Sequence, residues 1–259
     1  MVVRKYKILS NNLLVCDYGY IFKLILKSLK NKRVTLICPV ATYALVKANS
    51  NSYLKKVLDE FYLIPDSQWV KSSINFLYED KNALKMRATD LMLKILSLAE
   101  RNKLRIFLYG TNKNTLGKLQ LKLRNYFPNL AIAGAIPSKY RDLSDEEKQN
   151  VLLTIERSNT DIMFVGIGSP LQEVFSYELI NKNPYFRKPI VIITAGAAFD
   201  FISGVKPQAP KLFQESGLEW LFRLILEPKR LWKRYLIFGP LFLILVLFQK
   251  INRLKSKNA

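Results

Sequence analysis

Three arginines near the C-terminal end of the sequence have a spacing that suits phosphate. Arg223, Arg230 and Arg234 lie seven and four residues apart, which stacks them on one face if residues 216–235 form a continuous helix. Guanidinium groups are always charged, and their planar donors match phosphate oxygens. Residues 236–248 follow directly and are apolar throughout. We therefore expect an anionic group to bind here, at a membrane surface.

The apolar segment 236–248 is shorter than the roughly 20 residues that a helix needs to cross a bilayer. Trp220, Trp232 and Tyr235 precede it, and basic residues lie on both sides, as is typical of a lipid headgroup boundary. We expect the segment to lie in the membrane interface. The alternatives are insertion into one leaflet with a bend at residues 239–240, packing against another chain, and burial in the core.

Three expected strands end in turns that contain glycine, at Gly110, Gly168 and Gly196. At the carboxyl ends of parallel strands, glycine lets backbone amides approach phosphate, and the following helix adds a favourable dipole. None of the three turns is a complete dinucleotide-binding or P-loop motif, so a plain tight turn is the alternative for each. Together they predict a crevice for a nucleotide or a sugar phosphate.

The turn at Gly168 continues into an unusual sequence. Pro170 suits the first position of a helix, and Gln172 and Glu173 follow two and three residues later. We expect this polar pair to open a helix that faces the crevice. The alternative for Glu173 is that it only complements the helix dipole.

Alternating apolar and amphipathic segments from residue 34 onward must position these residues. Aliphatic and β-branched runs predict strands, and the longer segments between them predict helices. The expected strands are 34–38, 62–65, 105–110, 130–134, 161–166 and 189–196, and the expected helices lie near 41–58, 88–102, 115–126, 144–157 and 170–181.

This order of elements predicts an α/β fold with a Rossmann-like parallel sheet flanked by helices. We expect a small N-terminal α/β unit in residues 1–82 and the nucleotide-sugar domain in residues 83–203. Residues 204–259 would form a helical appendage that binds a membrane. A composition change near residue 80 marks the first boundary.

Composition excludes several kinds of chemistry. The 259 residues contain no histidine, which removes histidine bases, histidine-activated nucleophiles and histidine metal ligands. Cys16 and Cys38 are too few for a zinc cage and are expected in the core. The net charge of +21 suits nucleic acid, anionic lipid or a phosphorylated substrate. The N-terminus lacks the pattern of a secretory signal, so a cytoplasmic protein is expected.

The motifs of the second half of the chain resemble those of the WecG/TagA/CpsF glycosyltransferase family. The resemblance runs from about residue 34 to 236 and is densest after residue 105. Its motifs are GIGSPLQE at 166–173, GAAFDF at 196–201, Gly204, Ala209-Pro210, GLEW at 217–220, Glu227-Pro228, Arg230-Leu231 and RYL at 234–236. It implies inverting transfer of a sugar from a UDP-sugar to a polyprenyl-diphosphate-linked saccharide, with no essential metal and no cofactor.

The resemblance also implies roles for particular residues. The family's general base is an aspartate in a Pro-Asp-Gly motif, and Pro65 and Asp66 match its first two positions. Asp66 is therefore the expected catalytic base, whereas a capping aspartate is the alternative without the resemblance. Metal independence assigns neutralisation of the leaving diphosphate to the three arginines and to backbone amides.

Three further residues are expected to bind substrate on the same grounds. Lys85 stands where the family commonly has an arginine. Tyr140 aligns with a family tyrosine and is expected to stack on uracil, and Asp200 is expected to accept a hydrogen bond from uracil or ribose. The alternatives are a packing role for Tyr140 and a helix cap for Asp200.

Several positions depart from the family pattern. Ser67 replaces glycine, Ala88 replaces glycine, Gln208 replaces arginine, and residues 38–42 lack the expected Thr-x-Asn. These departures imply a donor or acceptor other than the N-acetylmannosamine and N-acetylglucosamine pair, or another surface polysaccharide. A catalytically inactive relative and a basic protein that binds nucleic acid or anionic lipid remain the alternative functions.

The expected partners follow from these arguments. They are a UDP-sugar, a polyprenyl-diphosphate-linked saccharide and the cytoplasmic face of the bacterial inner membrane, with no nucleic acid; the oligomeric state, a homo-oligomer included, is left open. We further expect membrane contact to order residues 217–235 over the crevice, with Pro228 as a point where this stretch can divide into two helices.

Overall fold

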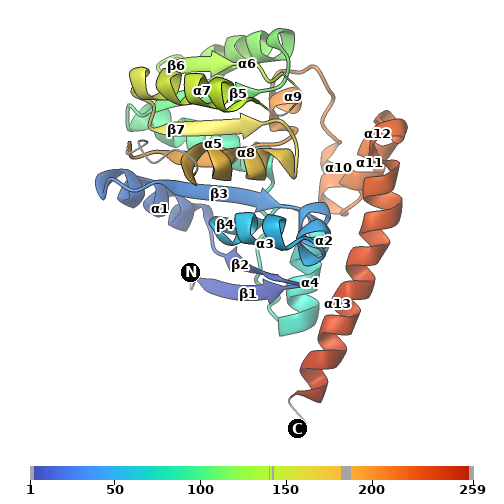
Figure 1. Ribbon diagram of the computed structural model, residues 1–259. Helices are drawn as coiled ribbons and strands as arrows, with labels where there is room; N and C mark the ends of the chain where they lie inside the picture. The colour runs from blue at the N-terminus through green and yellow to red at the C-terminus, as the bar shows by residue number, and fades with distance from the viewer. Residues whose placement is uncertain (1–2, 140, 142, 182–187, 257–259) are drawn as a thin grey trace.

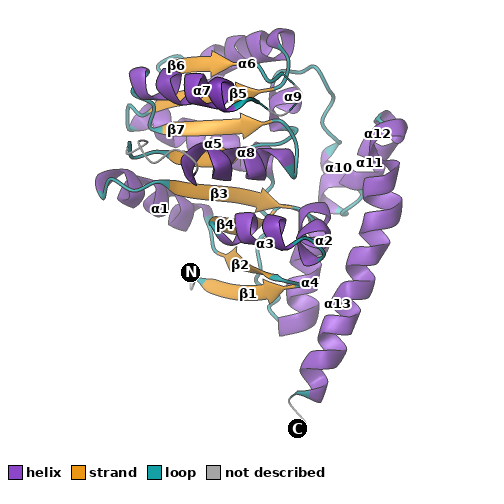
Figure 2. Ribbon diagram, in the orientation of Figure 1, coloured by secondary structure: helices purple, strands orange, loops and turns teal. Residues whose placement is uncertain are grey.

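A single sheet of eight strands forms the centre of the protein (Figure 1, Figure 2). The computed structural model describes residues 3–139, 141, 143–181 and 188–256. The strand order is β1-β2-β4-β3-β8-β7-β5-β6, and only the edge strand β1 is antiparallel to its neighbour. The strands are β1 Arg4–Ile8, β2 Asn11–Val15, β3 Thr35–Val40, β4 Phe61–Pro65, β5 Arg105–Gly110, β6 Ala131–Ile136, β7 Ile162–Gly166 and β8 Val191–Thr194.

Helices cover both faces of this sheet because its strands bury side chains on both sides. In β5, for example, Phe107 and Tyr109 join one core cluster, while Ile106 and Leu108 join the other. The first cluster is covered by α2 Thr42–Asn49, α3 Ser52–Asp59, α4 Gln68–Tyr78, α7 Asp145–Arg157 and α8 Leu171–Asn181. The second is covered by α1 Tyr18–Lys30, α5 Ala88–Arg101, α6 Lys113–Tyr126 and α9 Ala198–Ile202.

The α/β class, the parallel sheet and all six expected strands are confirmed. The capping box at Ser144 is present, with Glu147 bonded back to the Ser144 backbone. The structure adds the β1–β2 hairpin, α1 and α4, and it divides the expected helix at 41–58 into α2 and α3. This division occurs because the Asn51 side chain accepts the Leu54 N–H and so starts a new helix.

The N-terminal strands and the second expected unit share one sheet. β3 pairs directly with β8, with Ile37 opposite Ile193, so backbone hydrogen bonds join the two expected units. The boundaries at 82/83 and 203/204 stay predictions.

The C-terminal residues form a series of helices. These are α10 Lys211–Glu215, α11 Glu219–Leu226, α12 Pro228–Trp232, the π-helical turn η1 Lys233–Ile237 and α13 Phe238–Lys255. Residues 216–235 do not form the continuous helix that would stack the arginines; the expected division at Pro228 is confirmed, because the backbone leaves helical geometry at Glu227, with φ −135° and ψ 59°. Glu227 precedes Pro228, and a proline disfavours helical geometry in the residue before it.

Helix α13 lies along the side of the domain, next to α2 and α4 (Figure 1). Phe242 and Val246 are buried in the first core cluster, and Phe238 meets the Tyr43 ring edge-on at 4.9 Å. Farther along, Gln249 accepts the Leu9 N–H at 2.9 Å and donates to a backbone carbonyl of the β1–β2 hairpin at 2.8 Å. The helix is therefore attached to the domain over most of its length.

The helical run that contains α13 is longer than the apolar segment. By length and composition alone, the 28 residues Pro228–Lys255 are long and apolar enough to cross a membrane. The expectation that residues 236–248 lie in the membrane interface stays a prediction. The docking of α13 on α2, α4 and the hairpin leaves several apolar side chains of this helix exposed, and among them Leu241, Ile244, Phe248 and Ile251 share one face. We call this face the outer stripe of α13.

Candidate active site

A polar cavity of about 260 Å³ lies at the carboxyl ends of β4, β7 and β8, beneath the C-terminal helices. We call it the sheet-end cavity. Parallel sheets bind ligands at this end of their strands. Among the residues that line it are Asp66, Arg87, Thr111, Gly168, Gln172, Thr194, Gly196, Asp200, Lys206, Arg223, Glu227, Arg230 and Arg234.

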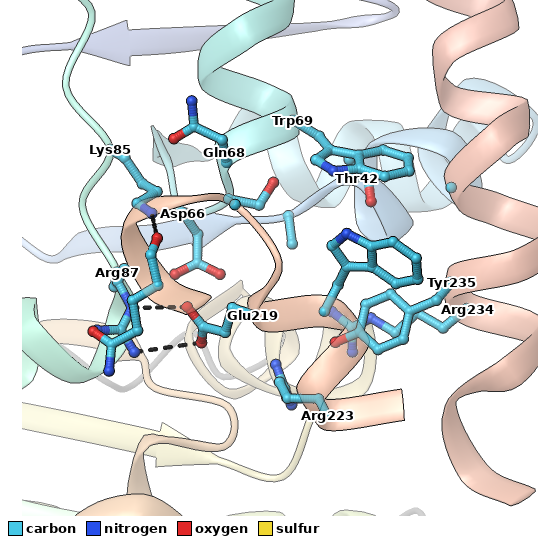
Figure 3. A pocket seen from close by; sticks show the side chains of 16 residues that line it. Thr42, Asp66, Gln68, Trp69, Lys85, Arg87, Glu219, Arg223, Arg234 and Tyr235 are labelled. Atoms are coloured by element: carbon cyan, nitrogen blue, oxygen red, sulfur yellow. Dashed lines mark hydrogen bonds and ion pairs between the residues drawn. The ribbon is translucent and has the colours of Figure 1, made fainter. Parts of the chain in front are cut away.

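A second cavity adjoins the first and is more aromatic (Figure 3). We call it the aromatic cavity. Asp66, Arg87, Glu219, Arg223 and Arg234 line both cavities, so the two are continuous at these side chains. The aromatic cavity adds Thr42, Gln68, Trp69, Lys85, Gln214, Trp220 and Tyr235.

Asp66 occupies the boundary between the cavities. It follows the last residue of β4, and its backbone N–H donates to Val40 at 3.1 Å. Its Oδ1 accepts the N–H of Ala88, the first residue of α5, at 2.8 Å. Ser67, which replaces the family glycine, accepts the Val70 N–H and caps α4. Asp66 therefore does accept a hydrogen bond at the start of α5, as the alternative role of a cap requires, but this bond uses only one of its two carboxyl oxygens.

The surroundings of Asp66 make it a stronger base than an ordinary aspartate. Burial raises its pKa to about 6, and the Glu219 carboxylate acts in the same direction. The Ala88 N–H, Arg223 and Arg234 favour the charged form and oppose this rise. The carboxyl is thus ionised near neutral pH, and its pKa is close enough to neutrality for proton transfer.

The three sequence-predicted arginines meet at the sheet-end cavity although they lie on separate helical segments. Arg223 lies over the Phe201 ring, 5.4 Å from its centroid, and Arg234 lies over the Tyr43 ring at 5.2 Å. Burial lowers the pKa of Arg234, but a guanidinium remains charged at any physiological pH. Arg230 is more exposed and pairs with Glu227 in two hydrogen bonds.

Gln172 and Glu173 occupy different places at the start of α8. Gln172 lines the sheet-end cavity, accepts the Gly196 N–H at 2.9 Å and donates to Glu173 Oε1 at 2.9 Å. Glu173 is only 1% exposed and lines neither cavity, which corrects the expectation that both side chains face the crevice. Burial raises its pKa, and Cys38 donates to it from the β3 side. Glu173 therefore positions Gln172.

The predicted glycines also divide into two groups. Gly168 and Gly196 line the sheet-end cavity at φ +89° and +52°, a region that suits glycine. Gly110 does not line it: a Cβ there would lie 2.4 Å from the Gly166 carbonyl oxygen. The absence of a side chain allows close packing between the ends of β5 and β7, and the expected contact of Gly110 with substrate stays a prediction. Tyr140 lies outside the described residues.

Asp200 lines the sheet-end cavity and Lys85 lines the aromatic cavity, and each interacts with another residue of the protein. Asp200 bonds to Lys206 at 2.8 Å and lies 3.5 Å from the Thr111 hydroxyl in the sheet-end cavity. Lys85 lies in the aromatic cavity and donates to the Gln214 carbonyl at 2.8 Å. Burial lowers the pKa of Lys85.

The sequence analysis missed two basic residues of the site. Arg87 is 7% exposed, lies directly before α5 and pairs with Glu219 at 3.0 Å. Lys206 bridges Asp200 and Glu227, at 2.8 and 2.9 Å. The only signal for Arg87 was its position before the expected helix start at residue 88. Within the described ranges, no group of three or more cysteine, aspartate or glutamate side chains could hold a metal ion.

Residues 217–235 form one wall of both cavities. Helix α11 supplies Glu219 and Arg223 to this wall, and the turn η1 supplies Arg234 and Tyr235 (Figure 3). The expectation that membrane contact orders this wall stays a prediction.

Comparison with known proteins agrees with this arrangement. Residues 6–256 match the model of the glycosyl transferase WecG/TagA/CpsF family. The chain is 31% identical to N-acetylglucosaminyldiphosphoundecaprenol N-acetyl-beta-D-mannosaminyltransferase of Bacillus subtilis (strain 168), over 85% of this chain and 80% of that protein. It is 28% identical to the protein of the same name from Staphylococcus aureus (strain MRSA252), over 80% and 74%. The chain therefore belongs to the WecG/TagA/CpsF family and is a glycosyltransferase.

Proposed function

We propose that this glycosyltransferase moves a sugar from a UDP-sugar to a saccharide linked to a polyprenyl diphosphate, with inversion and without an essential metal. The observation that carries the proposal is the position of Asp66. Its carboxyl lies where the sheet-end cavity meets the aromatic cavity, and burial raises its pKa to about 6. A base at that boundary can serve a donor in one cavity and an acceptor in the other.

The sheet-end cavity suits the UDP-sugar. Gly168 and Gly196 place backbone next to the cavity at the carboxyl ends of β7 and β8, and Arg223 and Arg234 supply positive charge on the opposite wall. Such donors stabilise a diphosphate as negative charge develops on it. Asp200 and Thr111 are available for the sugar or the nucleoside.

In the proposed reaction, Asp66 accepts the proton of an acceptor hydroxyl. The hydroxyl oxygen forms a bond to the anomeric carbon of the donor sugar, and the bond from that carbon to the diphosphate oxygen breaks. UDP leaves with the electron pair of the broken bond. Attack from the side opposite the leaving group inverts the anomeric configuration. A positioned base of this kind accelerates a reaction by about 10²–10⁴-fold.

The acceptor is proposed from the relatives and from the aromatic cavity. The names of both relatives include N-acetylglucosaminyldiphosphoundecaprenol, which is N-acetylglucosamine linked to undecaprenyl diphosphate. In this chain the aromatic cavity brings Lys85, Arg234 and Trp220 close to Asp66, which suits a diphosphate joined to a sugar. Departures such as Ser67 and Gln208 support a sugar pair other than that of the relatives.

We also propose that the protein binds the cytoplasmic face of the bacterial inner membrane without crossing it. The outer stripe of α13 is apolar and exposed, while the opposite face of α13 is attached to the domain. The net charge of +21 favours a surface of anionic lipid. A polyprenyl-linked acceptor would be reached from this position.

The test is release of UDP from a panel of UDP-sugars, with EDTA present and a short-chain polyprenyl-diphosphate-linked N-acetylglucosamine as the first acceptor. We expect acceptor-dependent release by the wild type and a loss of about 10²-fold or more in Asp66→Asn. Asparagine can still accept the Ala88 N–H, so the fold is retained. Failure of every donor and acceptor, in a protein that binds UDP, would favour an inactive relative. Release that requires added Mg²⁺ would refute metal independence.

A further inference from the structure

An open apolar groove runs between α4 and α13, outside both cavities of the site. Its lining consists of five apolar side chains and two serines: Trp69, Ser72, Ser73, Phe76, Leu243, Val246 and Leu247. The Ser73 hydroxyl donates to the Val70 carbonyl at 2.8 Å, so it needs no hydrogen-bond partner within the groove. Phe76, Leu243 and Leu247 are each about half exposed along it. The groove therefore suits a flexible hydrocarbon.

The groove begins at the aromatic cavity. Trp69 lines both of them, and the backbone of Gly239 lies so close to this ring that an added Cβ would be 3.1 Å from it. Trp69 also meets Trp220 edge-on at 5.9 Å, and Trp220 belongs to α11, the helix that carries Arg223. An apolar chain that leaves the aromatic cavity past Trp69 thus enters the groove directly.

The other end of the groove is marked by cations. Lys250 lies over the Phe76 ring at 5.6 Å, and Arg253 lies over the Tyr78 ring at 4.0 Å. From Gly239 to Leu247 the helix rises about 12 Å, which is long enough for a few isoprene units but far too short for a whole undecaprenyl chain. The remainder of such a chain has to continue into the bilayer, beside the outer stripe of α13.

We propose that this groove binds the isoprene units nearest the diphosphate of the lipid-linked acceptor. The inference rests on the proposed function and adds a path for the lipid: diphosphate near Lys85 and Arg234, first isoprenes past Trp69, and the rest of the chain in the membrane. Binding part of the lipid away from the bilayer fixes the distance between the diphosphate and Asp66. The groove is thus a specificity site for the acceptor lipid.

The kinetic test compares two acceptors with the same diphosphate sugar in detergent micelles, one on an undecaprenyl chain and one on a methyl group. The variants are Leu247→Gln and Ser72→Trp, which make the groove polar or fill it. For each, we expect the ratio of kcat/KM for the long acceptor to kcat/KM for the short acceptor to fall by roughly fivefold to tenfold, as expected for losing the burial of one apolar side chain.

Leu121→Gln is the matched control. Leu121 is 62% exposed and Leu247 is 52% exposed, but Leu121 lies on α6, which packs on the other core cluster, and outside the groove. We expect its acceptor ratio to equal that of the wild type. An unchanged ratio in Leu247→Gln and Ser72→Trp, or an equal fall in Leu121→Gln, would overturn the proposal. Absence of turnover on both acceptors in the wild type would instead refute the proposed function.

A second measurement does not depend on turnover. A farnesyl diphosphate that carries a benzophenone on its terminal isoprene is irradiated with the full-length protein, and labelled peptides are identified by mass spectrometry. We expect labels within residues 69–76 and 243–247 and their loss in Ser72→Trp. Labels confined to the outer stripe of α13 would show that the chain binds only the apolar surface and would overturn the proposal.

Discussion

The two carboxyl oxygens of Asp66 have different surroundings. Oδ1 accepts the Ala88 N–H and so fixes the carboxyl at the start of α5, whereas Oδ2 makes no hydrogen bond within the described part of the chain. A general base needs both features, because it must be held in place and still have a lone pair for the proton. These surroundings support the proposed role of Asp66 as the base.

The proposed role of Asp66 predicts a pH dependence of the reaction. Below its pKa of about 6, Asp66 is protonated and cannot accept a proton. We expect kcat/KM for the acceptor to rise about tenfold per pH unit up to pH 6 and to become level above it. Initial rates between pH 4.5 and 8 measure this profile. A profile that is already level at pH 5 would contradict the role of Asp66, and the residual activity of Asp66→Asn serves as the pH-independent control.

Stability should depend on Asp66 with the opposite sign to activity. Its pKa is raised in the folded state, so between about pH 4 and pH 6 the folded chain holds a proton that the unfolded chain releases. The free energy of unfolding therefore falls as the pH rises through this window. We expect Asp66→Asn to be more stable than the wild type at pH 7 and equal to it at pH 4. Urea denaturation at both pH values measures the difference, and a less stable variant at pH 7 would refute the argument.

At the scale of elements, the interruption at Glu227 and Pro228 is what brings the arginines together. In one straight helix, Arg223 and Arg234 would be separated by about 16 Å along the axis, too far to serve one diphosphate. The break lets α12 and η1 turn back toward the strand ends, so both guanidiniums line the same cavity. The sequence correctly indicated that the arginines share a site. Separate helical segments build that site, and not one face of a continuous helix.

The attachment of α13 to the β1–β2 hairpin is a second testable feature at this scale. Gln249 is the only residue of the described part of α13 whose side chain hydrogen-bonds to that hairpin, and it satisfies both Leu9 and Lys7. Replacing it with leucine leaves the Leu9 N–H without this partner, at a cost of about 1–3 kcal/mol where the group is buried. We expect Gln249→Leu to increase hydrogen exchange in residues 245–255.

Asn252→Leu is the control for this variant, because Asn252 is exposed on the same helix and its side chain makes no hydrogen bond within the described residues. It should leave the exchange of residues 245–255 unchanged. Equal protection of α13 in Gln249→Leu and the wild type would mean that apolar packing at Phe242 and Val246 alone holds the helix.

Sequence periodicity predicted six of the strands but not the β1–β2 hairpin or α4. Strands such as β7 are wholly buried and therefore read as apolar runs. The edge strand β1 has the sequence RKYKI, in which polar residues alternate, and α4 contains two serines and a lysine. Neither pattern identifies a strand or a helix unless the neighbouring elements on which it packs are known.

The sequence likewise predicted only part of the site. Gln172 and Asp66 lie in motifs, so both could be assigned to the site from the sequence. Arg87 and Lys206 are two of 41 basic residues, and only the fold shows that they face a cavity. Gly110 and Glu173 were predicted at the correct strand and helix ends but do not line the sheet-end cavity, because Gly110 packs against Gly166 and Glu173 is buried against Gln172.

At the scale of the whole molecule, basic residues accompany the apolar surface of α13. The apolar segment that carries the outer stripe is flanked in sequence by basic residues, among them Lys229 and Lys233 before it and Lys255 after it. A surface of this kind binds anionic membranes through two terms, of which salt screens only the electrostatic one. We therefore expect the protein to sediment with vesicles that contain phosphatidylglycerol, more weakly at 0.5 M NaCl but not to zero.

The apolar term can be separated by mutation. The double variant Ile244→Gln and Phe248→Gln removes two exposed apolar side chains, and we expect vesicle affinity to fall by roughly tenfold or more, since each contributes up to about 1.5–3 kcal/mol when buried. Leu121→Gln is the control, because Leu121 is 62% exposed on α6, which packs on the other core cluster. An equal loss in the control, or none in the double variant, would mean that charge alone holds the protein at the membrane, and the lipid path beside α13 would lose its support.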